Sequence, residues 1–194
     1  MSLPLQVART LSLSLLLTLA SFATAQESLQ AQIGIEVKSG KRMTWARANE
    51  RVHAGDFLRI HVMPAEPSYI YVVYTDGKDV TLLNSQGSQT QRHQGDVLIL
   101  PSQDQFYQIS AGSTEEHITV ICSREKIQEI PDMSAHELSP QQWSALEEKL
   151  MKKSEIDLSS AIEKPMPTAG NTRGMKSYTG KSLLVKKYAF QVAQ

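Results

Sequence analysis

The chain has 194 residues, of which 41% are hydrophobic and 21% charged, and its 20 Lys and Arg residues balance 20 Asp and Glu residues. This composition excludes a disordered chain, and only eight Pro and ten Gly exclude a collagen-like or linker-like one. The balanced charge argues against nucleic acid as a partner, since phosphate recognition usually leaves a basic surplus.

Residues 1–25 predict a signal peptide. Arg9 supplies the positive charge, an apolar run extends from Leu11 to Phe22, and Ala23-Thr24-Ala25 forms the small-residue cleavage signature. Cleavage is expected before Gln26. The apolar run is shorter than the ~20 residues that span a bilayer, and an uncleaved anchor is the alternative interpretation. No other stretch is long and apolar enough to cross a membrane, so we expect an exported protein that is periplasmic or secreted, with no transmembrane span after cleavage.

Residues 26–194 are expected to form a single β-rich domain. Seven short apolar or alternating runs predict strands, at residues 33–37, 57–62, 68–75, 80–83, 97–100, 106–109 and 117–121. The run 68–75 is apolar on both faces, which is typical of a central strand. Asp76-Gly77 after it predicts a hairpin turn. Strands of this length with polar turns indicate an antiparallel β-sandwich or barrel, and we predict the sandwich.

A helix is expected over residues 140–153, within a segment 139–153 that opens with a capping sequence. Ser139 can cap, Pro140 fits the first helical position, and Gln142 completes a capping box. The helix carries one apolar stripe, made of Trp143, Leu146, Leu150 and Met151, and Glu148 and Lys152 form an i,i+4 pair beside it. We expect the stripe to dock on the sheet; the alternative is that it binds a partner.

Residues 154–182 are expected to be loop-rich, because Pro and Gly recur there, at Pro165, Pro167, Gly170, Gly174 and Gly180. Residues 183–192 then predict a last strand. One of its faces carries Leu184, Lys186, Tyr188, Phe190 and Val192, and this aromatic face requires a partner. We therefore expect the strand to return to the sheet.

The strand-rich half resembles a known family. Gly55-Asp56, the strand to Val62, Ser68 to Val73, Asp76-Gly77 and Val80 to Asn84 follow one another in a recognisable order, and Gly95-Asp96, Phe106 to Ile109 and Ile118 to Ile121 continue it. Over residues 31–125 the chain resembles the bacterial domain of unknown function 4384. The resemblance implies a β-rich accessory module of exported or signalling proteins, and it implies no catalytic residues. In this family an aromatic residue and a proline often precede the Asn, whereas in this chain Leu83 directly precedes Asn84.

Residues with catalytic or metal-binding chemistry have plainer interpretations. The one cysteine, Cys122, excludes a disulfide within the monomer and lies in an apolar strand, where it is expected to be buried and inert. The five His residues show no zinc-ligand spacing. Asp56 and Asp96 each follow a Gly and are expected to accept turn hydrogen bonds. Glu115-Glu116 and His61 are expected to be solvated. We expect no enzyme activity, no metal and no cofactor.

The tyrosines provide the best hint of a binding site. Tyr69 and Tyr71 share one face of the strand 68–75, and Tyr74 lies on the other. Exposed tyrosines could stack on a glycan or seat a peptide, whereas the alternative is that both faces are core. A set of basic residues could meet an anionic envelope surface or protect a strand edge; it contains Arg173, Lys176, Lys181, Lys186 and Lys187.

These observations favour two functions. The first is a non-enzymatic interaction module of the cell envelope, which holds an envelope or periplasmic protein by a sheet edge or by residues 154–182. The second is a small-ligand or glycan binder that uses the tyrosine-rich sheet. The sequence identifies neither the ligand, the partner, the oligomeric state nor the pathway.

Overall fold

The computed structural model describes residues 28–85, 91–130, 138–154 and 174–193. They form, in order, β1 (Leu29–Ser39), β2 (Arg42–Trp45), β3 (Asn49–His53), β4 (Phe57–Pro64), β5 (Ser68–Thr75), β6 (Val80–Leu82), β7 (Gln91–Arg92), β8 (Leu98–Leu100), β9 (Tyr107–Gln108), β10 (Glu115–Ser123), α1 (Pro140–Ser154), β11 (Lys176–Gly180) and β12 (Leu183–Ala193). The predicted signal peptide, residues 1–25, lies outside the described residues.

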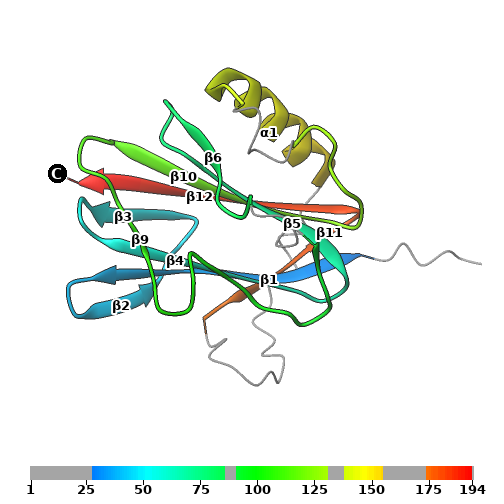
Figure 1. Ribbon diagram of the computed structural model, residues 1–194, viewed down its shortest axis with the longest axis horizontal. Helices are drawn as coiled ribbons and strands as arrows, with labels where there is room; N and C mark the ends of the chain where they lie inside the picture. The colour runs from blue at the N-terminus through cyan, green and yellow to red at the C-terminus, as the bar shows by residue number, and fades with distance from the viewer. Residues whose placement is uncertain (1–27, 86–90, 131–137, 155–173, 194) are drawn as a thin grey trace, which may run out of the picture.

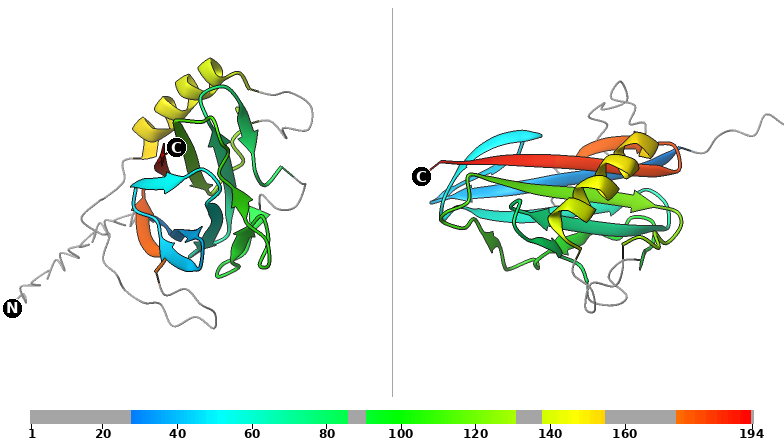
Figure 2. Two further views of the ribbon diagram at one scale, coloured as in Figure 1. Left: turned by 90° about the vertical axis from the view of Figure 1, so that its left-hand side faces the viewer. Right: turned by 90° about the horizontal axis from the view of Figure 1, so that it is seen from above.

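Two sheets and the helix make three layers (Figure 1, Figure 2). The first sheet has the order β11-β1-β4-β8, with β2 beside β1 and β9 beside β4. The second has the order β3-β12-β10-β5-β6, with β7 beside β5, and α1 lies across its outer face. The predicted β-sandwich with one helix and a returning last strand is confirmed. One pairing differs from the antiparallel expectation, because β3 and β12 run parallel.

The core lies between the sheets, because inward apolar side chains alternate with outward side chains along the longest strands. In β1 the inward side chains are Leu29, Ala31, Ile33, Ile35 and Val37, and all are buried. The aromatic face of β12 meets them from the second sheet, with Tyr188 and Phe190 buried. Side chains that alternate in this way place one apolar face of each sheet against the other and leave the second face for other contacts.

A second apolar cluster joins α1 to the outer face of the second sheet. Trp143 and Leu150 are buried there against Tyr71 and Val185. The capping box is confirmed, since the Ser139 N–H donates to Gln142 Oε1 at 3.0 Å and the Gln142 N–H donates to Ser139 Oγ at 3.3 Å. The predicted docking of the stripe is correct except at its end. Met151 is 47% exposed, and Glu147, one turn after Trp143, is buried instead.

Four short strands, β2, β3, β7 and β11, were not expected from the sequence. The loop prediction for residues 154–182 is wrong at Lys176–Gly180, which form β11 and pair with β1 from Leu29 to Ile33. Residues 155–173, which carry most of the Pro and Gly behind that prediction, and Arg173 of the basic set lie outside the described residues. β3 is polar and lacks period-two alternation, whereas β2 alternates over only four residues and β7 has only two.

The turns follow the predicted chemistry. Gly77 has a φ of +85°, and the Asp76 carboxylate accepts the N–H groups of Lys78 and Asp79 at 2.9 and 2.8 Å. Asp56 accepts the His53 N–H at 2.8 Å, and Asp96 accepts the His93 N–H at 3.3 Å. Both Gly-Asp pairs therefore have the expected structural role at the start of a strand.

Trp45 packs on the outer face of the first sheet where two glycines leave room for its ring. A Cβ on Gly34 would lie 2.6 Å from the ring, and a Cβ on Gly174 would lie 2.1 Å from it. On the same face, Glu36 Oε2 accepts Arg59 Nε–H at 2.8 Å and lies 3.3 Å from His61 Nε2. The prediction of a solvated His61 is wrong, because this ion-paired cluster and Trp45 cover it to 8% exposure.

Candidate functional site

The three tyrosines proposed for binding do not form one exposed surface. Tyr71 is buried beneath α1, where its hydroxyl accepts the Ile127 N–H at 3.0 Å. Tyr69, on the same face, is half-buried against the same cluster. Tyr74 lies on the opposite face of β5, toward the other sheet. Tyr69 and Tyr71 therefore do not form the exposed pair that the binding interpretation needs, and the alternative of a core position describes Tyr71.

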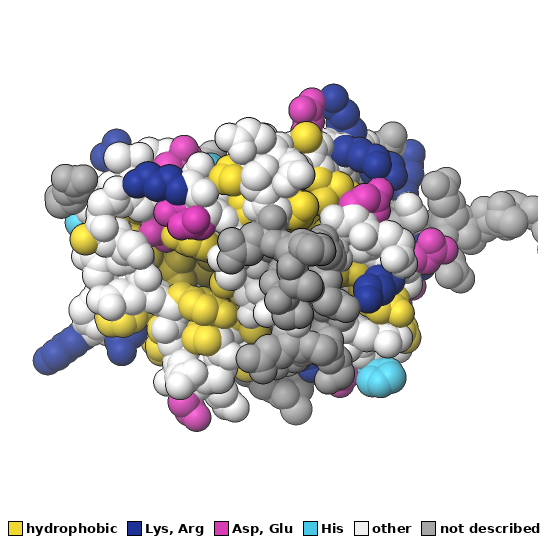
Figure 3. Space-filling view, turned by 45° about the horizontal axis from the view of Figure 1, so that its top comes forward, with side chains coloured by type: hydrophobic (Ala, Val, Ile, Leu, Met, Phe, Trp, Pro, Cys, Tyr) yellow, Lys and Arg dark blue, Asp and Glu magenta, His cyan; other side chains and the backbone are white. Residues whose placement is uncertain are grey.

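An open groove lies where the first half of α1 crosses the second sheet. Its volume is about 590 Å³. The helix contributes Pro140, Gln141, Trp143, Ser144, Ala145, Glu147 and Glu148, and the sheet contributes Thr75, Gly77, His117 and Lys187. We call this set the α1 groove. Figure 3 shows this side of the molecule, where basic and acidic side chains mix with exposed hydrophobic ones.

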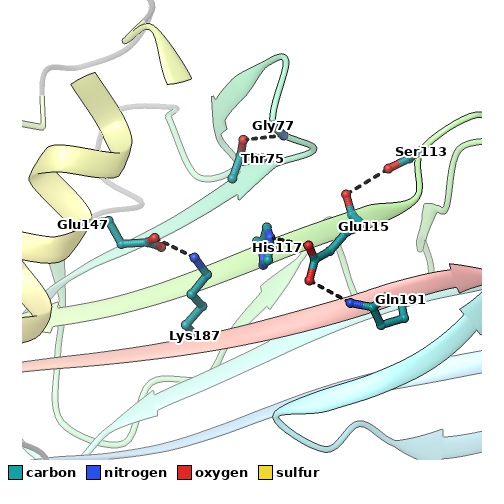
Figure 4. Close-up of polar contacts among 8 residues, drawn as sticks. All are labelled: Thr75, Gly77, Ser113, Glu115, His117, Glu147, Lys187 and Gln191. Atoms are coloured by element: carbon teal, nitrogen blue, oxygen red, sulfur yellow. Dashed lines mark hydrogen bonds and ion pairs between the residues drawn. The ribbon is translucent and has the colours of Figure 1, made fainter. Parts of the chain in front are cut away.

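An ion pair fixes the helix to the sheet within the groove. Lys187 Nζ donates to Glu147 Oε2 at 2.7 Å (Figure 4), and the other oxygen of the same carboxylate accepts the Thr119 hydroxyl. The Glu147 side chain is 9% exposed and that of Lys187 is 33% exposed. A buried carboxylate needs such partners, and two of them position α1 by polar contacts as well as by its apolar stripe.

His117 lies beside this pair and is held as a neutral imidazole. Its Nε2 is 3.6 Å from Glu115 Oε2, and Glu115 in turn accepts a hydrogen bond from Gln191 at 2.8 Å (Figure 4). Burial lowers the pKa of His117, the Lys187 ammonium lowers it further, and the carboxylates of Glu115 and Glu147 oppose the shift. At neutral pH the ring is therefore an uncharged hydrogen-bonding group.

Two buried nitrogens at the groove have no hydrogen-bond partner. They are Nδ1 of His117 and Nε1 of Trp143, and the whole Trp143 residue is 2% exposed. An unpaired buried polar group costs about 1–3 kcal/mol. The position of α1 on the sheet is thus stabilised by apolar contact, one ion pair and side-chain hydrogen bonds from Thr119 and to Ser154, at the expense of two unpaired nitrogens.

The edges of the sheets offer little backbone to an added strand. Edge strands have two to five residues, the longest being β3 and β11. The middle of β5 lacks a strand neighbour on its outer side, and there the buried Asn84 side chain accepts the Val72 N–H at 2.9 Å and donates to the Ile70 carbonyl at 2.7 Å. Short or capped edges resist pairing with another chain.

Other reactive groups in the described residues are buried or scattered. Cys122 is fully buried, as expected, and burial raises the pKa of its thiol to about 12. No cluster of three His, Cys, Asp or Glu residues suited to a metal ion occurs in the described part of the chain. The prediction of a solvated Glu115-Glu116 pair is wrong at Glu116, which is 3% exposed between the sheets.

Sequence reasoning missed most of the groove. Glu147 and Lys187 occupy polar positions of an amphipathic helix and a strand, a pattern that predicts solvent exposure. Two signals point to them in retrospect: α1 docks through its Trp143 face, and Glu147 lies one turn further along that face. The His117–Glu115 approach arises from i,i+2 neighbours on one face of β10.

No family model, no curated protein and no solved structure matches this chain. The resemblance to the domain of unknown function 4384 stays a prediction. Within residues 28–85, 91–130, 138–154 and 174–193, no helix combines the length and the apolar character needed to cross a bilayer.

Proposed function

We propose that the protein is an exported, non-enzymatic interaction module of the bacterial cell envelope, and that it binds an extended segment of a periplasmic or envelope protein in the α1 groove. The observation that carries the proposal is the groove itself. It is about 590 Å³ in volume and combines the apolar side chains of Pro140, Trp143 and Ala145 with polar ones, among them a neutral His117 and a Lys187–Glu147 ion pair. Apolar walls with a few fixed polar groups are typical of recognition sites.

A polypeptide suits the hydrogen-bonding groups at the groove. The proximity of Glu115 to Nε2 favours the His117 tautomer with its proton on Nε2, so that Nδ1 is an acceptor. Trp143 Nε1 is a donor. A peptide group supplies the complementary N–H and C=O. A small displacement of α1 would expose both nitrogens, and pairing them would recover part of the cost of leaving them buried and unpaired.

The sheet edges favour binding of a partner in the α1 groove over addition of a partner strand to a sheet. The edge strands are short, and Asn84 occupies the longest gap beside β5. Residues 154–182, the other partner-binding segment expected from the sequence, are described only at Ser154 and from Gly174 onward. The groove combines accessible volume with positioned polar groups.

Site-specific photocrosslinking in the producing cells tests the proposal. A photoreactive phenylalanine analogue at Ser144, which is exposed on α1 in the groove, should give one dominant adduct with a periplasmic or envelope protein. The same analogue at Lys41, in the exposed turn between β1 and β2, should not. Adducts of equal yield at both positions, or none at Ser144, would contradict the proposal.

Two matched substitutions on α1 separate groove binding from surface charge. Ala145→Arg places a long side chain in the groove, and Met151→Arg places the same side chain on an exposed position that the groove does not include. Ala145→Arg should abolish the Ser144 adduct and Met151→Arg should retain it. Export is tested separately by the mass of the periplasmic protein, which should begin at Gln26.

A further inference from the structure

A second cavity opens between the two sheets, apart from the α1 groove. Its volume is about 210 Å³. The walls are Leu58, Leu83, Ile109 and Ile118, the rings are Tyr74 and Tyr107, and the polar groups are Gln108, Ser110 and Glu116. We call it the Glu116 pocket.

Glu116 is a buried carboxyl group without a cation. The residue is 3% exposed, and one of its oxygens accepts the Ser110 N–H at 3.3 Å. A hydrogen bond with the Tyr74 hydroxyl is its other polar contact. No Lys, Arg or His in the described part of the chain forms an ion pair with it. Every other carboxylate that is buried to this degree, such as Glu36 or Glu147, has a basic partner.

The surroundings of Glu116 disfavour its negative charge. Burial raises the pKa of Glu116, and the negative charge of Asp76 raises it too, while the Ser110 N–H and the Tyr74 hydroxyl lower it. The pKa values of Tyr74 and Tyr107 are also raised, chiefly by burial, so that both hydroxyls stay protonated. A buried carboxylate is costly unless a positive group pairs with it, and the pocket contains none.

We propose that the Glu116 pocket binds a small organic ammonium ion with an apolar body. The ammonium group pairs with the Glu116 carboxylate, and the apolar body fills the space between the leucine and isoleucine side chains. The Tyr74 and Tyr107 rings add surfaces to which a cation is attracted. Pockets for drug-sized ligands measure about 300–1,000 Å³, so the ligand that fits here is smaller, on the order of a single-ring or short-chain monoamine. This site is independent of the proposed partner groove.

Three probes of one shape and different charge test the proposal. Isothermal titration calorimetry of the purified protein at pH 7 would use 2-phenylethylamine, the neutral 2-phenylethanol and the anionic 3-phenylpropanoate. We expect the amine to bind at least tenfold more tightly than the alcohol, and the anion not to bind. Equal affinities for the three probes, or no binding of the amine at millimolar concentration, would overturn the proposal.

Two Glu→Gln variants test whether the preference for the amine over the alcohol depends on the Glu116 carboxylate. Glu116→Gln keeps the shape of the side chain and the acceptor for the Ser110 N–H, and it should reduce the affinity for the amine to that for the alcohol. Glu125→Gln makes the same charge change at an exposed position elsewhere and should leave the preference intact. Retention of the preference in a folded Glu116→Gln protein, verified by circular dichroism, would also overturn the proposal. The affinity of the wild type for the amine should fall as the pH is lowered and Glu116 takes up a proton.

Discussion

The side-chain amide of Asn84 completes the hydrogen bonding of β5 by accepting the Val72 N–H at 2.9 Å. The same amide donates to the Ile70 carbonyl at 2.7 Å, and Asn84 is fully buried. A side chain thus occupies the position of a neighbouring strand between β6 and β7, both of which pair with β5. The second sheet would otherwise expose unpaired backbone groups at this point of its edge.

Asn84→Ala should destabilise the protein by roughly 2–4 kcal/mol, because two buried backbone groups lose their partners and each costs about 1–3 kcal/mol. Urea denaturation monitored by fluorescence measures the free energy of unfolding. Asn49→Ala, at an exposed position of the edge strand β3, is the control and should change it by less than about 0.5 kcal/mol. Equal effects of the two substitutions would refute the capping role.

Gly34→Ala should destabilise the protein by about 1–3 kcal/mol, because the new Cβ would lie 2.6 Å from the Trp45 ring. The backbone of Gly34 does not have a positive φ, so the cost is steric. Combining Gly34→Ala with Trp45→Leu should therefore cost less than the sum of the two single substitutions. Strict additivity in this double-mutant cycle would show that the ring and the glycine do not interact.

Glu116→Gln should stabilise the protein at neutral pH. The pKa of Glu116 is raised in the folded state above its unfolded value of about 4.3, so between these two values the folded protein holds more protons. Wild-type stability falls as the pH rises through this interval, and the glutamine variant does not undergo that loss. The two proteins should be equally stable near pH 4 and differ at pH 7. Denaturation curves at both pH values test this, and a difference that is largest at pH 4 would contradict it.

Ser154→Ala should weaken the attachment of α1 to β12. Ser154 Oγ accepts the Val185 N–H at 2.9 Å, and both residues are buried. The loss leaves a buried N–H unpaired, at a cost of about 1–3 kcal/mol. Amide hydrogen exchange at Val185 should accelerate, whereas Ser182→Ala, in the exposed turn before β12, should leave it unchanged. Unaltered protection of Val185 in Ser154→Ala would mean that another group shields it.

The sequence predicts those parts of the fold in which apolar side chains recur along a long stretch of residues. β5, β10 and β12 carry runs that only a buried strand explains, and α1 carries a capping box and a stripe. β2, β3 and β11 have only four or five residues each, and most residues of β3 and β11 are polar. β2 forms a hairpin with β1, whereas β3 and β11 pair with β12 and β1, which lie far from them in the chain, so local propensity carries no signal for β3 and β11.

The buried polar residues escaped prediction for a related reason. His61 and Glu116 occupy positions at which alternation or an adjacent charge indicates solvent, and tertiary contacts bury both. His61 is covered because Glu36, Arg59 and Trp45 gather on the outer face of the first sheet. Glu116 is covered because the loop at Ser110 folds over it. The residues that cover His61 and Glu116 lie on other segments, so residue spacing along one strand does not predict them. The turn roles of Asp56 and Asp96 are local and were predicted correctly.

The last twenty described residues contribute to both sheets, β11 beside the first strand of the chain and β12 between β3 and β10. Both sheets therefore stay incomplete until residues 176–193 have been synthesised, and in the second sheet β12 is an interior strand. Long-range closure of this kind delays folding relative to synthesis. A precursor whose sheets stay incomplete late in synthesis is suited to threading through a secretion channel in an unfolded state, which is the route that the proposed export requires.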